Sequence, residues 1–161
     1  MSRRWVVDAS PLILLGKIGQ VGLLHELADE LVVPQAVVLE VASRPEGAAV
    51  IEQVRSFERA SVAAEVSVTA ELWTWGLGPG ESQVLALTSM VPGSRAVLDD
   101  LDGRRCAQAF GLPVIGTLGV VLRAKRKGVI PAARPVIDHL RRVGLFASDQ
   151  LIKRALAHVE E

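Results

Sequence analysis

Short apolar runs alternate along the chain with longer segments that have helical periodicity. The runs at residues 4–7, 31–33, 96–98 and 112–115 are bounded by polar or turn residues. Continuous apolar runs of this length are typical of strands that are buried on both faces. Residues 60–68 are ambiguous between a strand and a loop. Strands that alternate with helices predict an α/β fold with a mainly parallel sheet covered on both faces.

Apolar spacing and capping signals predict the helices. Ser10 and Pro11 suit the N-cap and first position of a helix that runs through residues 21–28. Asp102 is interpreted as the N-cap of a helix that begins at Gly103, and Thr117 as the N-cap of the next. The predicted helices after the first cover residues 35–43, 46–57, 81–89, 103–110, 117–127, 132–143 and 149–159. A sharp Gly-Pro-Gly loop precedes the helix at residue 81.

Composition favours one cytoplasmic domain. The chain has 161 residues, of which 50% are apolar, and a mean hydropathy of +0.34, so we expect a single domain over residues 1–161 with an adequate core. No apolar run reaches the roughly 18 residues that a membrane span needs. Asp8 interrupts the run after the basic N-terminus, which therefore lacks a signal-peptide core. Cys106 is alone and forms no intrachain disulfide.

Charge argues against broad binding to nucleic acid but leaves room for a local basic groove. The 18 basic and 18 acidic residues cancel, whereas non-specific binding needs a basic surface. The basic residues between Arg123 and Lys127 are able to contact phosphates, although cations at a helix C-terminus also complement the helix dipole. The three histidines show no metal-ligand spacing.

Acidic residues occur where the predicted strands and helices end or begin. Asp8 follows the strand at residues 4–7, Asp99 and Asp100 follow the strand at residues 96–98, and Glu40 and Glu81 lie in apolar surroundings. Parallel strands bring their carboxyl ends to one edge, where ligands bind. Carboxylates gathered there repel one another unless a cation lies between them, and Mg²⁺ prefers carboxylate oxygens. The sequence therefore predicts a metal-dependent nuclease.

Each of these acidic residues also has a purely structural interpretation. Asp8 is able to form an Asx turn, Glu40 to pair with Arg44 at i+4, and Glu81 to stabilise a helix N-terminus. Glu81 nevertheless shares a helix face with apolar residues at i+3 and i+4, which points it towards the sheet edge. Asp99 is the preferred ligand after its strand, and Asp100 is a second ligand or a solvated residue.

Six short motifs occur in order along the chain. They are DASPLI at 8–13, KIG at 17–19, PQAVVLEV at 34–41, LGPGES at 77–82, LDD at 98–100 with Arg104 and Ala107, and GTLGV at 116–120 with Ala124 and Lys125. Taken together, these motifs resemble the PIN-domain superfamily and, more closely, its branch of VapC-like toxins with a Gly-x-Gly-Glu loop. The resemblance extends from Val6 to about Leu151.

This resemblance implies a three-layer α/β/α sandwich and a ribonuclease that uses one or two Mg²⁺ or Mn²⁺ ions. The four acidic positions of the family map to catalytic residues Asp8, Glu40, Glu81 and Asp99, or Asp100 if the register shifts by one. The implied metal ligands are Asp8, Glu81, Asp99 and Asp100. The third position is commonly Asp in VapC toxins, so Glu81 is a departure.

The resemblance also implies partners. A toxin of a type II toxin–antitoxin pair would cleave RNA, form a homodimer and be blocked by a small antitoxin protein. Ser10, Arg104 and Lys125 are the candidate RNA contacts.

Two other functions remain open from the sequence. A PIN-like scaffold that binds RNA or a partner without cutting would fit the neutral charge and the Glu at position 81. A haloacid-dehalogenase-like phosphatase would use Asp100 as nucleophile and Asp102 as general acid, but Arg104 stands where that motif has a small residue.

Overall fold

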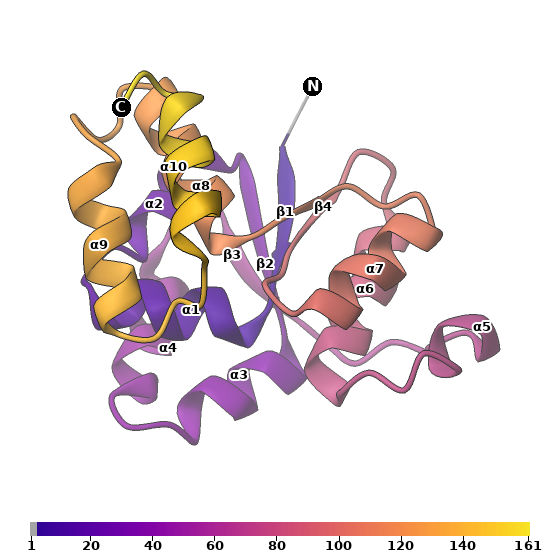
Figure 1. Cartoon of the computed structure of the whole chain (residues 1–161). Coiled ribbons are helices and arrows are strands. Elements are labelled where there is room, and N and C mark those ends of the chain that lie inside the picture. Colours follow the sequence, from indigo (N-terminus) through magenta and orange to yellow (C-terminus); the bar gives the residue numbers. More distant parts are fainter. Residues whose placement is uncertain (1–2) are drawn as a thin grey trace.

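The computed structural model describes residues 3–161, and its centre is a five-stranded sheet (Figure 1). The strand order is β3-β2-β1-β4-β5, and every pair is parallel. Residues 60–68 thus contain a strand, which is confined to the first four of them. The strands are β1 (Arg4–Val7), β2 (Glu30–Pro34), β3 (Ala60–Ala63), β4 (Arg95–Val97) and β5 (Val114–Ile115).

Helices cover both faces of this sheet, which confirms the predicted three-layer α/β/α sandwich. In Figure 1, α1, α2, α8, α9 and α10 lie on one side of the strands, and α6 and α7 lie on the other. The ten helices within residues 3–161 are α1 (Ala9–Lys17), α2 (Gly22–Leu27), α3 (Gln35–Ala42), α4 (Gly47–Ser56), α5 (Ala70–Trp73), α6 (Pro79–Met90), α7 (Leu101–Ala109), α8 (Thr117–Arg126), α9 (Arg134–Arg142) and α10 (Asp149–Ala157).

The first predicted helix is wrong in two respects. It is two helices, α1 and α2, because Gly19 adopts a positive φ of 68° between them. It also begins two residues earlier than predicted, since Asp8 rather than Ser10 is the N-cap of α1. Ser10 therefore lies inside the first turn, where its hydroxyl is free to bond elsewhere.

Two more N-caps differ from the prediction. Asp100 caps α7 by accepting a hydrogen bond from the Gly103 N–H at 3.1 Å, so Asp102 is not the cap. Gly116, not Thr117, is the N-cap of α8. In each case a second residue of suitable type stands one or two places away, and local pattern does not choose between them.

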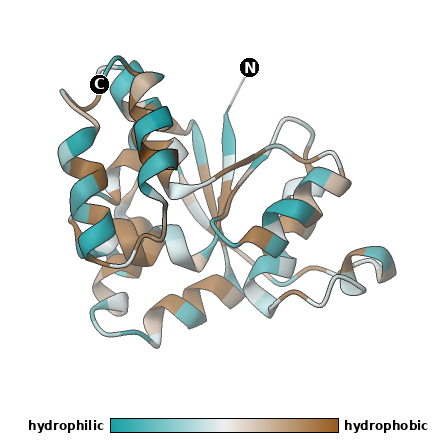
Figure 2. Ribbon diagram, viewed as in Figure 1, coloured by the Kyte–Doolittle hydropathy of each residue, from teal (hydrophilic) through white to brown (hydrophobic). Residues whose placement is uncertain are grey.

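The core lies between the layers and is made by the strands and the inward faces of the helices. Val6, Val7 and Val97 are fully buried, as are Leu12 and Leu15 of α1. Figure 2 shows apolar segments on the strands and on α1, whereas α9 and α10 alternate between apolar and polar residues. Trimming a buried Leu to Ala in such a core costs about 2–5 kcal/mol.

The three tryptophans do not share one role. Trp5 is 1% exposed and belongs to the core, whereas Trp73 and Trp75 are 73% and 40% exposed. Packing in the core is therefore excluded for Trp73 and Trp75.

Across residues 3–161, no helix is long and apolar enough to cross a membrane.

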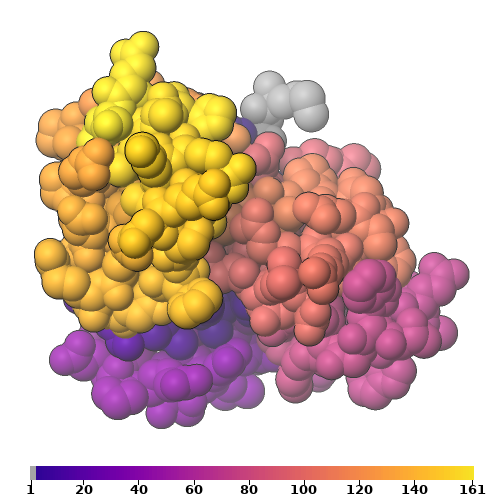
Figure 3. Space-filling view, in the orientation of Figure 1, coloured from indigo at the N-terminus to yellow at the C-terminus, as the bar shows by residue number. Residues whose placement is uncertain are grey.

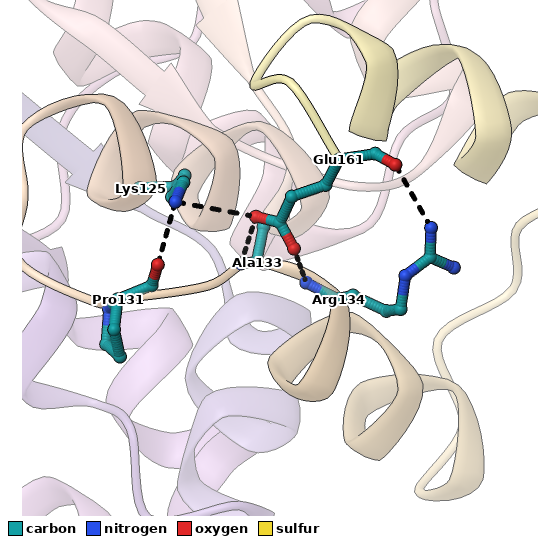
Figure 4. Close-up of polar contacts among 5 residues, drawn as sticks. All are labelled: Lys125, Pro131, Ala133, Arg134 and Glu161. Carbon is teal, nitrogen blue, oxygen red and sulfur yellow. Dashed lines mark hydrogen bonds and ion pairs between the residues drawn. The ribbon is translucent and has the colours of Figure 1, made fainter.

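Glu161 ties the C-terminal segment to the loop before α9 (Figure 4). Its carboxylate accepts hydrogen bonds from the backbone N–H groups of Ala133 at 2.7 Å and Arg134 at 3.0 Å. Lys125 lies 3.9 Å from the same carboxylate and donates to the Pro131 carbonyl at 2.7 Å. These contacts hold the end of α10 against α8 and α9.

Candidate active site

The strand order places a crevice between β1 and β4. The chain passes from β1 to β2 and β3 on one side, and then crosses to β4 and β5 on the other. Ligands of open α/β sheets bind beyond the carboxyl ends of the strands at such a switch point. Asp8 follows β1 directly and its N–H bonds to the Val97 carbonyl at 3.0 Å, while Asp99 lies two residues beyond β4.

A cavity of about 1420 Å³ opens at this edge. Figure 3 shows it as a cleft between the C-terminal helices and α7. Of the candidate RNA contacts, Ser10 and Arg104 also line it, whereas Lys125 is absent from its walls and is engaged by Pro131 and Glu161. The acidic residues that line the cavity are Asp8, Glu40, Glu81, Asp99 and Asp100. The sequence thus predicted every carboxylate that the fold brings together here.

Gly80 in the first turn of α6 and Gly103 in the first turn of α7 make room for three of these carboxylates. A Cβ on Gly80 would lie 3.2 Å from Oε2 of Glu40 and 3.5 Å from Oδ1 of Asp8. Glu40 of α3 and Asp8 therefore converge on one point above Gly80. A Cβ on Gly103 would likewise lie 3.1 Å from Oε2 of Glu81. Small residues at both positions keep the space between the carboxylates free.

Asp99 is fixed by three hydrogen bonds. Its Oδ1 accepts from the Thr117 N–H at 2.7 Å, and its Oδ2 accepts from the Thr117 hydroxyl at 2.7 Å and the Ser10 hydroxyl at 3.1 Å. These donors lie at the start of α8 and α1, so two helices orient one carboxylate. Thr117 is fully buried, and it is a candidate supporting residue that its interpretation as a helix cap did not suggest.

Arg104 brings positive charge to the same place. A Cβ on Gly116 would lie 2.5 Å from Nη1 of Arg104 and 3.0 Å from Oδ1 of Asp99. The guanidinium of α7 and the carboxylate thus meet across a glycine. Asp100 caps α7 and Glu81 lies in the first turn of α6, where the helix dipoles partly offset the negative charge.

Like charge and burial raise two pKa values in this site. Burial, opposed by a hydrogen bond from the Ala9 N–H and reinforced by Glu40, Asp99 and Asp100, raises the pKa of Asp8 from 3.8 to about 7. Burial and then the charge of Asp100 raise the pKa of Glu81 from 4.5 to about 7. The site therefore takes up protons near neutral pH unless a cation compensates the carboxylates.

The donor chemistry fits a hard divalent ion. All five acidic side chains offer oxygen, which suits Mg²⁺ or Mn²⁺ better than a soft metal. Among the described residues, no group of three or more His, Cys, Asp or Glu side chains is arranged to hold an ion directly. Mg²⁺ usually keeps several waters and takes one or two protein carboxylates. The residues therefore fit a partly hydrated ion rather than a closed protein cage.

Comparison with known proteins settles the family. A family model described as a PIN domain matches residues 4–161. The chain belongs to the PIN-domain family. This membership confirms the superfamily part of the resemblance and points to nuclease activity, and PIN nucleases generally use divalent metal ions.

A solved structure supports the same fold. The PIN domain endonuclease Utp24 aligns with a TM-score of 0.52 and 8% identity, over 70% of this chain and 84% of that chain. At this identity the likeness concerns the fold of the PIN domain and not its substrate. Comparison with curated proteins gives no significant match.

Proposed function

We propose that this PIN domain is a ribonuclease that depends on Mg²⁺ or Mn²⁺ and acts as the toxin of a type II toxin–antitoxin pair. One observation carries the nuclease part: carboxylates from β1, α3, α6 and the loop after β4 line one cavity at the switch point. The raised pKa values of Asp8 and Glu81 support a cation there, because an ion would relieve their mutual repulsion.

The proposed role of each residue follows from its position in the cavity. Asp8 and Asp99 would hold the ion, with Glu40, Glu81 and Asp100 binding it directly or through its water shell. A divalent ion supplies an activated water and neutralises charge in phosphodiester hydrolysis. Thr117 and Ser10 hydrogen-bond Asp99 and would keep it in a fixed orientation, and Arg104 would pair with a phosphate beside Asp99.

RNA cleavage with matched variants tests this proposal. The wild type is incubated with a mixed RNA pool and Mn²⁺, Mg²⁺ or EDTA, beside Asp8→Asn and Asp102→Asn. Asp102 is exposed and lies outside the cavity lining, so its variant is the matched acidic control. Cleavage is expected for the wild type and Asp102→Asn with metal, and its persistence in Asp8→Asn would rule out this site.

The toxin role, the antitoxin, the homodimer and the cytoplasmic location come from the resemblance to VapC-like toxins. Induced expression in bacteria tests the first of these. The wild type is expected to arrest growth and Asp8→Asn to allow it. Cleavage of RNA in vitro without growth arrest would retain the ribonuclease and remove the toxin.

A PIN scaffold that binds RNA without cutting it is the second candidate. It is favoured by Glu81 at the third acidic position and by the lack of a direct ligand group for metal within residues 3–161. Calorimetric titration with Mn²⁺ separates the two candidates. The scaffold would bind no ion, whereas the nuclease would bind one through Asp8 and Asp99. The phosphatase alternative loses support, since Asp102 would be its general acid and lies outside the cavity lining.

A further inference from the structure

The cavity continues beyond the carboxylates into an apolar half that the proposed catalytic roles leave unused. This half is walled by α1, α8, α10 and the loop between α9 and α10. Its apolar side chains are Leu14, Leu118, Leu122, Leu145, Phe146 and Leu151. One continuous cavity therefore joins an acidic end to an apolar end.

Phe146 is displayed at this end by a loop that is fixed on both sides. Its side chain is fully exposed, whereas Val143, Leu145 and Ala147 pack against the core. Lys17 donates a hydrogen bond to the Val143 carbonyl at 3.4 Å, and Arg141 donates to the Ala147 carbonyl at 3.3 Å. The backbone is thus held while the aromatic ring stays uncovered.

Basic side chains line the same cavity as the ring. Leu151, Arg154 and Ala155 of α10, and His158 at its C-cap, line the cavity. Their spacing of three and four residues places them on one helix face. Arg104 lies at the acidic end of the same cavity. A strand of nucleic acid needs both an aromatic surface for its bases and cations for its phosphates. An apolar protein segment needs only an apolar surface.

We propose that Phe146 is a specificity-determining residue that stacks on one unpaired base of the RNA strand whose scissile phosphate lies at the carboxylates. Arg154 and His158 contact phosphates of that strand. This inference rests on the proposed function, because it takes RNA as the occupant of the acidic half. The exposed ring selects unpaired bases, since both faces of a base are covered within a duplex.

Binding measurements test this role without relying on cleavage. The proteins carry Asp8→Asn, and the probe is a fluorescein-labelled oligoribonucleotide of about 12 nucleotides, with Mg²⁺ present. Phe146→Ala is expected to weaken binding about 5- to 150-fold, which is the usual value of one stacked base, and Phe146→Trp to restore it. Trp73→Ala is the matched control, because Trp73 is 73% exposed and lies outside the cavity lining.

A series of probes with one abasic position each distinguishes stacking from a structural effect. One abasic position is expected to weaken binding to the Phe146 protein as much as Phe146→Ala does, and to have no further effect on Phe146→Ala. Equal abasic penalties in both proteins would overturn the inference. So would sedimentation showing a dimer that Phe146→Ala dissociates, because the ring would then be an interface residue.

The outcomes separate this inference from the proposed function. Base-dependent binding without any cleavage by the wild type would remove the nuclease and support the base subsite. Normal cleavage by the wild type, with Phe146→Ala showing an unchanged KM on the same RNA, would retain the nuclease and overturn the subsite.

Discussion

Asp8 is the residue at which folding and the proposed chemistry conflict most directly. Its side chain is 6% exposed and faces other carboxylates. Burying a charge is tolerated only when something compensates it. The cation that this site is proposed to bind would supply that compensation, so the cost of Asp8 in the free protein is consistent with a functional role.

The first prediction follows from the raised pKa of Asp8. Between pH 3.8 and about 7 the folded protein holds a proton that the unfolded chain has lost, so stability falls as pH rises through this window. Each unit of the shift corresponds to about 1.4 kcal/mol. Asp8→Asn is therefore expected to raise Tm by several degrees at pH 8 in EDTA, and to leave it unchanged below pH 3.8.

Thermal melts at several pH values check this prediction, with Mg²⁺ added in a second series. The ion is expected to stabilise the wild type more than Asp8→Asn, which reverses the order seen in EDTA. Equal Tm values for both proteins in EDTA at pH 8 would show that the ionised Asp8 does not destabilise the folded protein.

The second prediction concerns Thr117, whose hydroxyl and N–H both bond Asp99. Thr117→Val keeps the shape but loses the hydroxyl donor, so Asp99 is less firmly oriented. Loss of such a supporting hydrogen bond typically lowers metal affinity or activity 10- to 100-fold. Thr117→Ser keeps the hydroxyl and is expected to stay near wild type. Calorimetric Mn²⁺ affinity decides, and equal losses in both variants would indicate a packing effect instead.

At the scale of single residues, the sequence pointed to the carboxylates and to Ser10, but not to Thr117 as a partner of Asp99. Asp8 and Asp99 are recognisable because a charge directly after an apolar strand is unusual. Thr117 is not, because a Thr at a helix start has an adequate explanation as a cap. Its contact with Asp99 joins residues 18 apart and depends on the pairing of β5 with β4, which brings the start of α8 next to the residues after β4.

Among the elements, α10 forms one wall of the cavity and is tied down at both ends. Arg141 pairs with Asp149 at 2.7 Å near its start, and the bonds of Glu161 hold the segment after its end. The sequence predicted this helix but not its place along the cavity. Local periodicity marks its buried face, whereas its position depends on long-range contacts made through Glu161.

The third prediction tests this tie. Backbone hydrogen bonds from Ala133 and Arg134 lower the pKa of Glu161, so its stabilising effect is present above the ordinary value of 4.5 and is lost as pH falls through the lowered value. Glu161→Gln is expected to lower Tm by about 2–4 °C at pH 7, and to speed amide exchange in α10.

Glu160→Gln is the matched control for this change, because it removes an adjacent acidic charge. In acid, well below pH 4.5, the wild type and Glu161→Gln are expected to melt together. A Tm difference that persists there would show that the charge of Glu161 is not what secures α10.

Although the net charge of the whole molecule is zero, the two edges of the sheet carry opposite charges. The carboxyl ends of the strands carry the five acidic residues, while Arg3, Arg95 and Arg126 gather around Arg123 near the amino ends. Burial and then these neighbouring arginines lower the pKa of Arg123, whose guanidinium lies 6.0 Å from the Trp5 ring. Composition alone does not reveal this separation, because it follows from the parallel arrangement of the strands.

The two edges give opposite predictions for the salt dependence of RNA binding. If RNA lies in the cavity, its phosphates meet few cations, chiefly Arg104 and Arg154. For a single strand, the slope of log K against log salt becomes more negative by about 0.7 for each phosphate that the protein neutralises. We therefore expect a slope of about −1.4 for Asp8→Asn and of about −0.7 when Arg154→Ala is added to it. A slope of about −3 or steeper that is unchanged in Arg154→Ala, but reduced in Arg126→Ala, would place the RNA on the basic edge instead.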